Sequence, residues 1–224
     1  MFPRIRHISD VLPHLSGARE IERAFRRYDR DGYVVLDYEI LSGGVFGCLE
    51  RDGHKESLLI RREARGLKFH PETGELLARP HPKFLNVGEA PETQPDRLDW
   101  PRASLVLEKL DGSEIHAMLL DRGVEWATRK GHVNSANARE FARRSDVNHE
   151  GFARAMIQCE GTTPIYEWCS PKDKIVLDYA EDRLVLTALR DNLTGAYADH
   201  DAVMAEAGRW GIEVVPEWGR NVSD

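Results

Sequence analysis

The sequence predicts an α+β fold with mainly antiparallel sheets and flanking helices. Strand-like runs rich in β-branched, aromatic and aliphatic residues outnumber helical patterns along the chain. Turn-forming residues separate several of these runs by only a few positions, which favours hairpins over parallel crossovers. The chain has 224 residues, of which 41% are hydrophobic and 31% charged, so it is long enough to bury a substantial core.

The N-terminal part of the chain begins with a helical pattern. Residues 18–28 place Ile21, Ala24 and Phe25 on one face and arginines opposite, which predicts a short amphipathic helix. The other elements expected here are a strand at 32–40, an extended segment within 56–69, a turn at 71–74 and a surface loop at 88–101.

The C-terminal part of the chain holds most of the expected strands. Asp111-Gly112 is a strong hairpin-turn dipeptide, so we expect the strands on either side of it to pair with each other. Apolar spacing predicts helical structure over 137–160, divided near 146–148, and a last helix over 201–210 that ends at Gly211. The strands expected in this part are 103–110, 114–120, 125–130, 165–169, 174–179 and 183–189.

Composition and charge narrow the class of protein. No apolar run is long enough to cross a membrane, and the N-terminus lacks the apolar core of a signal peptide. Cys48, Cys159 and Cys169 are an odd number without metal-ligand spacing, so we expect reduced thiols in a cytoplasmic protein. The formal net charge of −7 argues against a protein that coats nucleic acid without specificity. Residues 1–70 carry 13 Lys and Arg against 11 Asp and Glu, whereas residues 151–224 carry 7 against 13.

The motif most suggestive of chemistry is Lys-x-Asp-Gly-Ser at residues 109–113. A lysine beside a tight turn can direct its amine into a cleft, where it acts as a nucleophile once it is neutral. A solvated lysine on a surface hairpin is the alternative, because a tetrad this short also arises by chance. Other segments of the chain favour the nucleophile.

Several segments occur in the order seen in the nucleotidyltransferase domain of the T-even phage type of RNA ligase, the ATP-dependent tRNA-repair ligases. They resemble an Arg-Gly segment, an Arg-Pro-x-x-Lys-Phe-x-Asn segment, the lysine motif, a Lys-Gly element and an aromatic-Glu-aromatic motif. These lie at 63–69, 78–86, 109–113, 129–131 and 166–168, with a further element at 174–179 and 190–195. The resemblance implies a ligase fold of the nucleotidyltransferase (ATP-grasp-like) type.

The resemblance also implies residue roles. Lys109 would attack the α-phosphorus of ATP and carry AMP, and Asp111 would orient it or organise the metal and ribose side. The nucleotide-binding residues implied are Arg65, Lys83, Lys109, Gly112, Lys130, Glu167 and Lys174, with Tyr166 or Trp168 near the base. ATP and Mg²⁺ (or Mn²⁺) would be the cofactors, and RNA with 5′-phosphate and 3′-OH ends the substrate. The metal ligands are not identified.

Each of these residues has a plainer interpretation. Lys83, Lys130 and Lys174 are also compatible with solvated charges at strand ends, and Arg65 with a turn cation paired with Glu63. His116 and His132 are better explained as ordinary strand and turn residues, because the histidines show no paired-ligand spacing.

Two later elements of the family, a Glu-Gly-x-Val motif and a Lys-x-Lys motif, have no counterpart after Gly195. The RNA-specificity domain of the family is absent as well. We therefore expect residues 1–224 to form a single, partial nucleotidyltransferase domain. It would be one piece of a ligase completed by a second polypeptide, a truncated or degenerate gene product, or a noncatalytic nucleotide- or nucleic-acid-binding remnant.

Overall fold

The computed structural model describes residues 2–39, 45–46, 55–99, 105–131 and 135–220. Its strands form two four-stranded sheets and one two-stranded sheet, and neighbouring strands pair antiparallel. The first sheet contains β1 (Phe25–Arg30), β2 (Tyr33–Tyr38), β3 (Leu67–Phe69) and β4 (Leu76–Ala78) in that order. The second has the order β7 (Gly123–Thr128), β6 (Ser113–Leu120), β8 (Thr162–Cys169) and β9 (Arg183–Asp191). The small sheet pairs β5 (Leu105–Leu107) with β10 (Glu217–Arg220).

Helices cover the outer faces of the two large sheets. They are α1 (Arg19–Ala24), α2 (Lys55–Glu63), α3 (Ser135–Arg144), α4 (His149–Glu160) and α5 (His200–Trp210). Short 3-10 turns occur at Ile8–Asp10, Leu12–Leu15, Pro91–Thr93 and Pro95–Arg97. None of the helices in the described parts of the chain has the length and apolar character that a membrane span requires.

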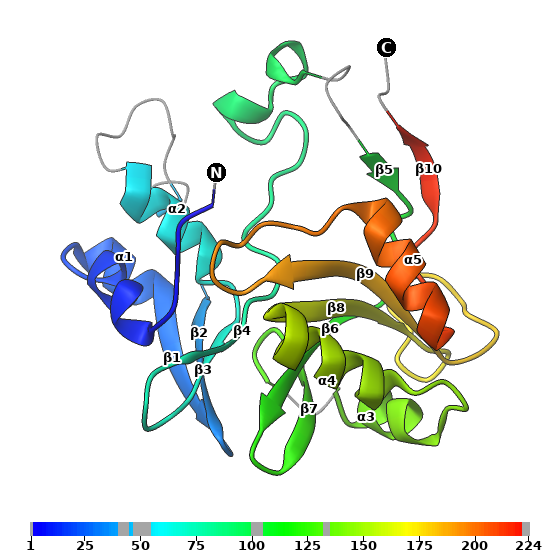
Figure 1. Cartoon of the computed structure of the whole chain (residues 1–224). Helices are drawn as coiled ribbons and strands as arrows, with labels where there is room; N and C mark the ends of the chain where they lie inside the picture. The colour runs from blue at the N-terminus through cyan, green and yellow to red at the C-terminus, as the bar shows by residue number, and fades with distance from the viewer. Residues whose placement is uncertain (1, 40–44, 47–54, 100–104, 132–134, 221–224) are drawn as a thin grey trace.

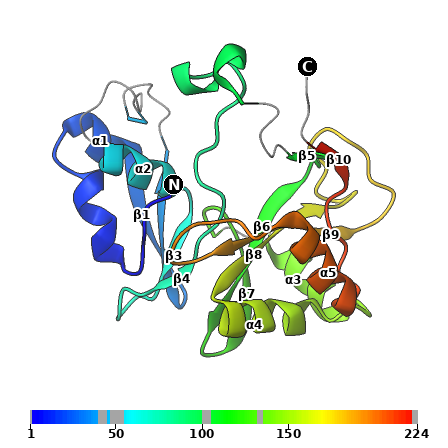
Figure 2. The ribbon, with the colours of Figure 1, turned by 45° about the horizontal axis from the view of Figure 1, so that its top comes forward.

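The large sheets face each other, so the molecule has a helix–sheet–sheet–helix order (Figure 1). Val35 of β2 and Ala78 of β4 pack against Met118 of β6 and Ala127 of β7 between the sheets. α1 and α2 pack on the other side of the first sheet, and α3, α4 and α5 on the other side of the second. Figure 2 shows the two halves side by side, with the chain crossing between them above the sheets.

Local sequence explains where the helices in the second half begin and end. The side chain of Asn148 caps α4, and the side chain of Asp199 accepts bonds from two backbone N–H groups of α5. Both helices end at a glycine in the left-handed conformation, Gly161 and Gly211. These caps confirm the predicted last helix and its end at Gly211, and they agree with a division of the 137–160 region into two helices.

The α+β fold with antiparallel sheets is confirmed, and two local predictions are wrong. The helix predicted over 18–28 stops at Ala24, because Phe25 to Arg30 pair with β2 as an edge strand. The extended segment predicted within 56–69 is present as β3 (Leu67–Phe69), and the helix α2 precedes it. Residues 174–179 form no strand, since β9 pairs directly with β8 and leaves them as a loop.

The hairpin expected at Asp111-Gly112 is also absent. β5 pairs with β10 of the small sheet, whereas β6 pairs with β7 and β8 of the second large sheet. The tight hairpin in this region lies instead between β6 and β7, where Leu120 opposes Gly123. Residues 108–112 therefore cross from one sheet to another, and this crossing carries the lysine motif. Cys48 and His132 lie outside the described residues, while Cys159 and Cys169 are free thiols.

Candidate active site

Lys109 lies in the crossing segment, held by its two neighbours. The Glu108 N–H donates to the Pro216 carbonyl at 2.9 Å, and Leu110 is buried against Cys169, Val185 and Val215. Because both flanking positions are anchored, the lysine side chain is left exposed beside the start of β6. Its Nζ lies 3.5 Å from the Leu110 carbonyl oxygen. The arrangement leaves the amine available to react with a bound molecule.

Asp111 fixes the loop that follows β8. Its Oδ2 accepts hydrogen bonds of 2.7 Å from the backbone N–H groups of Val176 and Leu177, and these bonds lower the pKa of the carboxyl. The backbone N–H of Asp111 donates to the Tyr179 hydroxyl at 2.9 Å. The carboxylate thus binds residues 171–180 to the lysine motif. Orientation of Lys109 by Asp111 itself, as the resemblance implies, stays a prediction.

Gly112 joins the lysine motif to Glu167. Its N–H donates to Glu167 Oε1 at 2.9 Å, and a Cβ at this position would lie only 2.2 Å from the Trp168 carbonyl oxygen. Burial raises the pKa of Glu167 to about 7, opposed by the Gly112 hydrogen bond and by the charge of Lys109. Glu114 lies directly opposite Glu167 in the β6–β8 pair, on the same face of the sheet.

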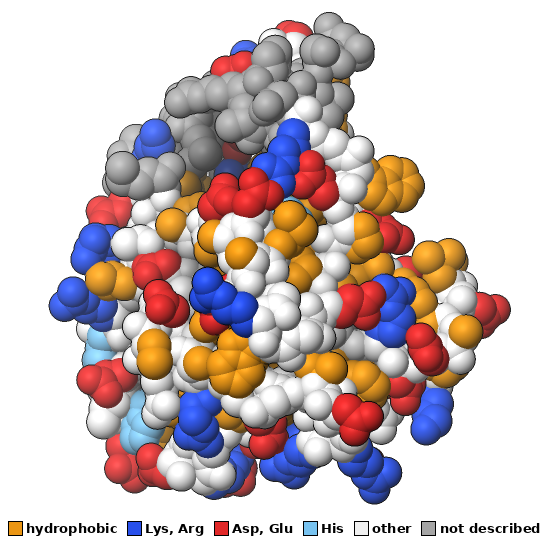
Figure 3. Space-filling view, turned by 45° about the vertical axis from the view of Figure 1, so that its right-hand side comes forward, with side chains coloured by type: hydrophobic (Ala, Val, Ile, Leu, Met, Phe, Trp, Pro, Cys, Tyr) orange, Lys and Arg blue, Asp and Glu red, His pale blue; other side chains and the backbone are white. Residues whose placement is uncertain are grey.

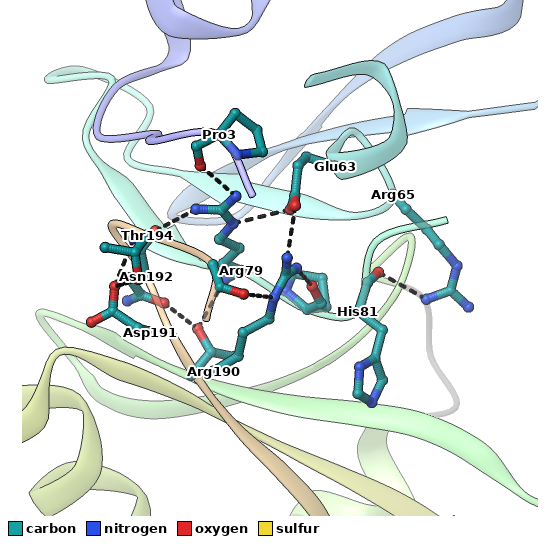
Figure 4. Close-up of polar contacts among 12 residues, drawn as sticks. Pro3, Glu63, Arg65, Arg79, His81, Arg190, Asp191, Asn192 and Thr194 are labelled. Carbon is teal, nitrogen blue, oxygen red and sulfur yellow. Dashed lines mark hydrogen bonds and ion pairs between the residues drawn. The ribbon is translucent and has the colours of Figure 1, made fainter. Parts of the chain in front are cut away.

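Arg65 reaches Glu114 of this site from the first half of the molecule. Its guanidinium donates to the His81 carbonyl at 3.1 Å (Figure 4). It also donates to Glu114 Oε2 at 2.8 Å and lies 5.1 Å from the centre of the exposed Phe84 ring. The interpretation of Arg65 as a turn cation paired with Glu63 is therefore wrong. Glu114, which the sequence did not single out, completes a group with Arg65, Gly112 and Glu167.

The three predicted lysines occupy different places. Lys83 is largely buried and donates to Glu89 at 2.8 Å and to the Phe84 carbonyl at 2.6 Å. Lys130 lies at the end of β7, with Nζ 5.8 Å from the Tyr28 ring centre. Lys174 pairs with Asp178 at 2.6 Å in the exposed loop and is the most solvated of the three. Their contacts with a nucleotide remain predictions.

Two buried side chains near Arg65 were not predicted to be functional residues. Lys68 of β3 is fully buried, donates to the carbonyls of Gly66 (2.6 Å) and Arg129 (2.9 Å), and has its pKa lowered to about 7 by burial. His116 of β6 is also fully buried, and burial holds its pKa well below the usual range. The interpretation of His116 as a strand residue is confirmed. The sequence signal for Lys68 is that a lysine stands between the apolar residues of a strand, where a buried side chain is expected.

A buried ionic network joins the two halves of the molecule. Glu63 at the end of α2 accepts from Arg79 at 3.0 Å and from Arg190 of β9 at 2.7 Å, and all three side chains are almost fully buried. Arg79 also donates to the carbonyls of Pro3, Asn192 and Leu193, as Figure 4 shows. This network was not predictable from local sequence patterns, because its members lie up to 127 positions apart.

Two further expectations fail or find no support. Tyr166 and Trp168 are buried in the core beneath α3 and α4, because alternation along β8 directs them away from the face that carries Glu167, so neither packs near a bound base. Within the described residues no group of three His, Cys, Asp or Glu side chains could hold a metal ion. The acidic side chains near Lys109 are already bonded to the 171–180 loop, Gly112 and Arg65. They do not fit a dedicated metal centre.

Comparison with known proteins identifies the family. The profile of a family described as RNA ligase matches residues 63–219, the stretch that contains Arg65, Lys109 and Glu167. The chain belongs to this RNA ligase family. All the candidate nucleotide-binding residues lie inside the matched stretch.

Individual proteins that the chain resembles agree with this family. It is 37% identical over 145 residues to a protein of Thermovibrio ammonificans named "Putative RNA ligase", covering 64% of this chain and 37% of that one. It is 29% identical over 197 residues to RNA ligase 1 of Bacteriophage TS2126, covering 83% and 47%. Two forms of an archaeal ATP-dependent RNA ligase share the fold, with TM-scores of 0.57 and 0.58 at 15% identity, covering 89% of this chain and 48% of theirs. The chain therefore spans less than half the length of these proteins.

Proposed function

We propose that the protein is an ATP-dependent RNA ligase that carries AMP on Lys109. In the first step the Lys109 amine, after losing a proton, would attack the α-phosphorus of ATP. The new N–P bond replaces the P–O bond to the departing pyrophosphate. The observation that carries the proposal is the exposed Lys109 beside the Gly112–Glu167 bond and the Arg65–Glu114 pair.

The next steps follow from the family chemistry that the sequence resembles. AMP passes from Lys109 to the 5′-phosphate of RNA, and a 3′-OH then displaces AMP as the phosphodiester forms. Arg65, Lys83, Lys130 and Lys174 would bind phosphate or ribose oxygens, and Glu167 the ribose hydroxyls. The metal would arrive with the nucleotide phosphates, as Mg²⁺ commonly does, and we place the reaction in the cytoplasm.

Intact mass spectrometry after incubation with ATP and MgCl₂ tests the first step. We expect one AMP per chain, absent from Lys109→Arg, which keeps the positive charge without the nucleophilic amine. Lys55→Ala, at an exposed position of α2, is the matched control and should retain the adduct. ATP binding without an adduct would favour the alternative, a noncatalytic nucleotide-binding module.

The length of the relatives supplies a second arm. If the chain alone gives no adduct, the part of the phage relative beyond the matched region is added as a separate polypeptide. An adduct that appears only with this addition supports the proposal that a second piece completes the site. No adduct in either arm rejects catalysis by Lys109.

A further inference from the structure

Four cations and one tyrosine lie together along the edge of the first sheet. We call this group the cation–aromatic strip. It consists of Arg26, Tyr28, Arg30, Arg129 and Lys130. The function proposed above assigns a role only to Lys130, and the other members carry none.

The strand register explains why the β1 members are together. In the β1–β2 pair, Arg26 opposes Asp37 and Tyr28 opposes Val35, so these side chains share one face. Val35 packs against the second sheet, which shows that this face is the one directed between the sheets. β1 is the edge strand, so Arg26, Tyr28 and Arg30 lie along the edge of the first sheet.

Contacts across the two halves order the strip. The Arg30 guanidinium lies 5.1 Å from the Tyr28 ring centre, and Lys130 Nζ lies 5.8 Å from the same centre. Arg30 Nε also donates to the Lys130 carbonyl at 3.1 Å. Arg129 lies 4.0 Å from the centre of the ring of Tyr38, a buried core residue that also interacts electrostatically with Arg65. Cation–π contacts of this kind hold the side chains in place without neutralising their charge.

The charge of the strip is only partly balanced. Asp37 is fully buried and pairs with Arg129 at 2.7 Å, and Glu39 pairs with Arg26 at 3.3 Å while accepting from the Tyr28 hydroxyl at 2.5 Å. Four cations thus face two carboxylates. The face drawn in Figure 3, by contrast, intersperses acidic and basic side chains without an extended basic area.

We propose that the cation–aromatic strip binds the sugar–phosphate backbone of single-stranded RNA next to the end that is joined. Arginine and lysine side chains in a row bind successive phosphates, and a tyrosine among them offers a surface for a sugar or a base. Arg129 connects the strip through Tyr38 to Arg65 of the candidate active site, so the strip leads outward from the reacting end. This inference rests on the proposed RNA ligase function and adds the surface that the RNA strand follows.

Fluorescence anisotropy with a 5′-phosphorylated RNA of roughly 16 nucleotides, the upper size of a single-strand site, tests the strip. The double variant Arg26→Ala/Arg30→Ala is compared with Arg27→Ala, which removes an exposed arginine from the opposite face of the same strand. We expect the double variant to bind roughly tenfold more weakly near 0.1 M salt. The slope of log K against log salt should fall by about 1.4, because each lost phosphate contact removes about 0.7. Arg27→Ala should keep both values.

A gain of affinity provides a test that loss of folding cannot imitate. Glu39→Gln removes the partly exposed carboxylate of the strip while keeping a hydrogen-bond acceptor for Tyr28. We expect this variant to bind the RNA roughly two- to fivefold more tightly at low salt, with the advantage lost as salt is raised. Equal affinity of the double variant and Arg27→Ala, or no gain in Glu39→Gln, would overturn the proposal.

Two results separate this inference from the proposed function. An AMP adduct on Lys109, together with RNA affinity that the strip variants do not change, would reject the inference and leave the ligase proposal standing. Strip-dependent RNA binding without any adduct would support the inference and reject catalysis by Lys109.

Discussion

At the scale of single residues, Gly112 is the position where a side chain cannot be added. A Cβ would lie 2.2 Å from the Trp168 carbonyl oxygen, so Gly112→Ala must push the lysine motif away from β8 and break the bond to Glu167. We expect at least a tenfold slower AMP adduct and a stability loss of about 1–3 kcal/mol. Gly208→Ala is the matched control. Gly208 lies in the last turn of α5, and a Cβ there would have no neighbour within 4 Å, so the substitution should stabilise the protein slightly. Time-resolved intact mass and urea unfolding measure both quantities.

Glu167 predicts a pH dependence of stability. Burial raises its pKa from 4.5 to about 7, so the folded state binds more protons than the unfolded state between these values. The contribution of Glu167 to stability therefore falls as pH rises through this window. Glu167→Gln removes that slope, and between pH 5 and pH 8 it should gain on the order of 1–3 kcal/mol relative to the unchanged protein. Urea unfolding at the two pH values measures it, and an equal slope in both proteins would contradict the role of burial.

The single residues that the sequence identified are those with a motif around them. Lys109, Asp111, Gly112 and Glu167 were recognised because their order and spacing are local, and the structure brings them together in one place. Glu114 and Lys68 were missed because their importance depends on strands that pair across the fold. The residues around Glu114 in the sequence do not indicate Arg65 as its partner, and those around Lys68 do not indicate the Arg129 carbonyl.

At the scale of elements, the 171–180 loop depends on Asp111. The carboxylate accepts two backbone hydrogen bonds from it, and the loss of both bonds lets the loop open more often. Asp111→Ala should therefore speed amide hydrogen exchange in this loop by roughly ten- to a hundredfold. Asp178→Ala, which removes an exposed carboxylate of the same loop, should leave the Val176 and Leu177 amides unchanged. Exchange monitored by mass spectrometry on peptides 171–180 decides between them.

Elements were predicted well where the hydrophobic periodicity extended over many residues and capping residues marked the ends. α5 has a capping Asp199 and a terminal Gly211, and the local pattern predicted it closely. The strand predicted over 174–179 was wrong because Ile175, Val176 and Leu177 are exposed, and a β-branched run is no strand without a partner. The hairpin at Asp111-Gly112 was wrong for a related reason. The turn chemistry fits, but β5 and β6 find their partners in different sheets.

At the scale of the whole molecule, the Glu63–Arg79–Arg190 network joins the two halves that contribute residues to the candidate active site. Glu63→Gln removes the charge and leaves two buried guanidinium groups without their carboxylate, which typically costs about 3–5 kcal/mol. The urea midpoint should fall accordingly. Asp29→Asn, which breaks an exposed pair with Arg27, should leave the midpoint unchanged. A small effect of Glu63→Gln would show that the sheets are held by the apolar contacts alone.

The fold class and the family were predictable from the sequence, whereas the way in which the sheets pack together was not. The ordered motifs identified the RNA ligase family, which the match over residues 63–219 confirms. How the two large sheets face each other was not predictable, because it depends on long-range pairing and on buried arginines. The cation–aromatic strip follows from the same assembly, since β1 and the end of β7 meet only in the folded molecule.

The most direct measurement of the central claim is the position of AMP on the chain after incubation with ATP and Mg²⁺, mapped by tandem mass spectrometry. The account predicts AMP on Lys109 alone. Lys68 is the informative rival, because its pKa of about 7 makes it readily neutral while its burial keeps it from ATP. AMP on Lys68, on Lys83 or on no lysine at all would contradict the account.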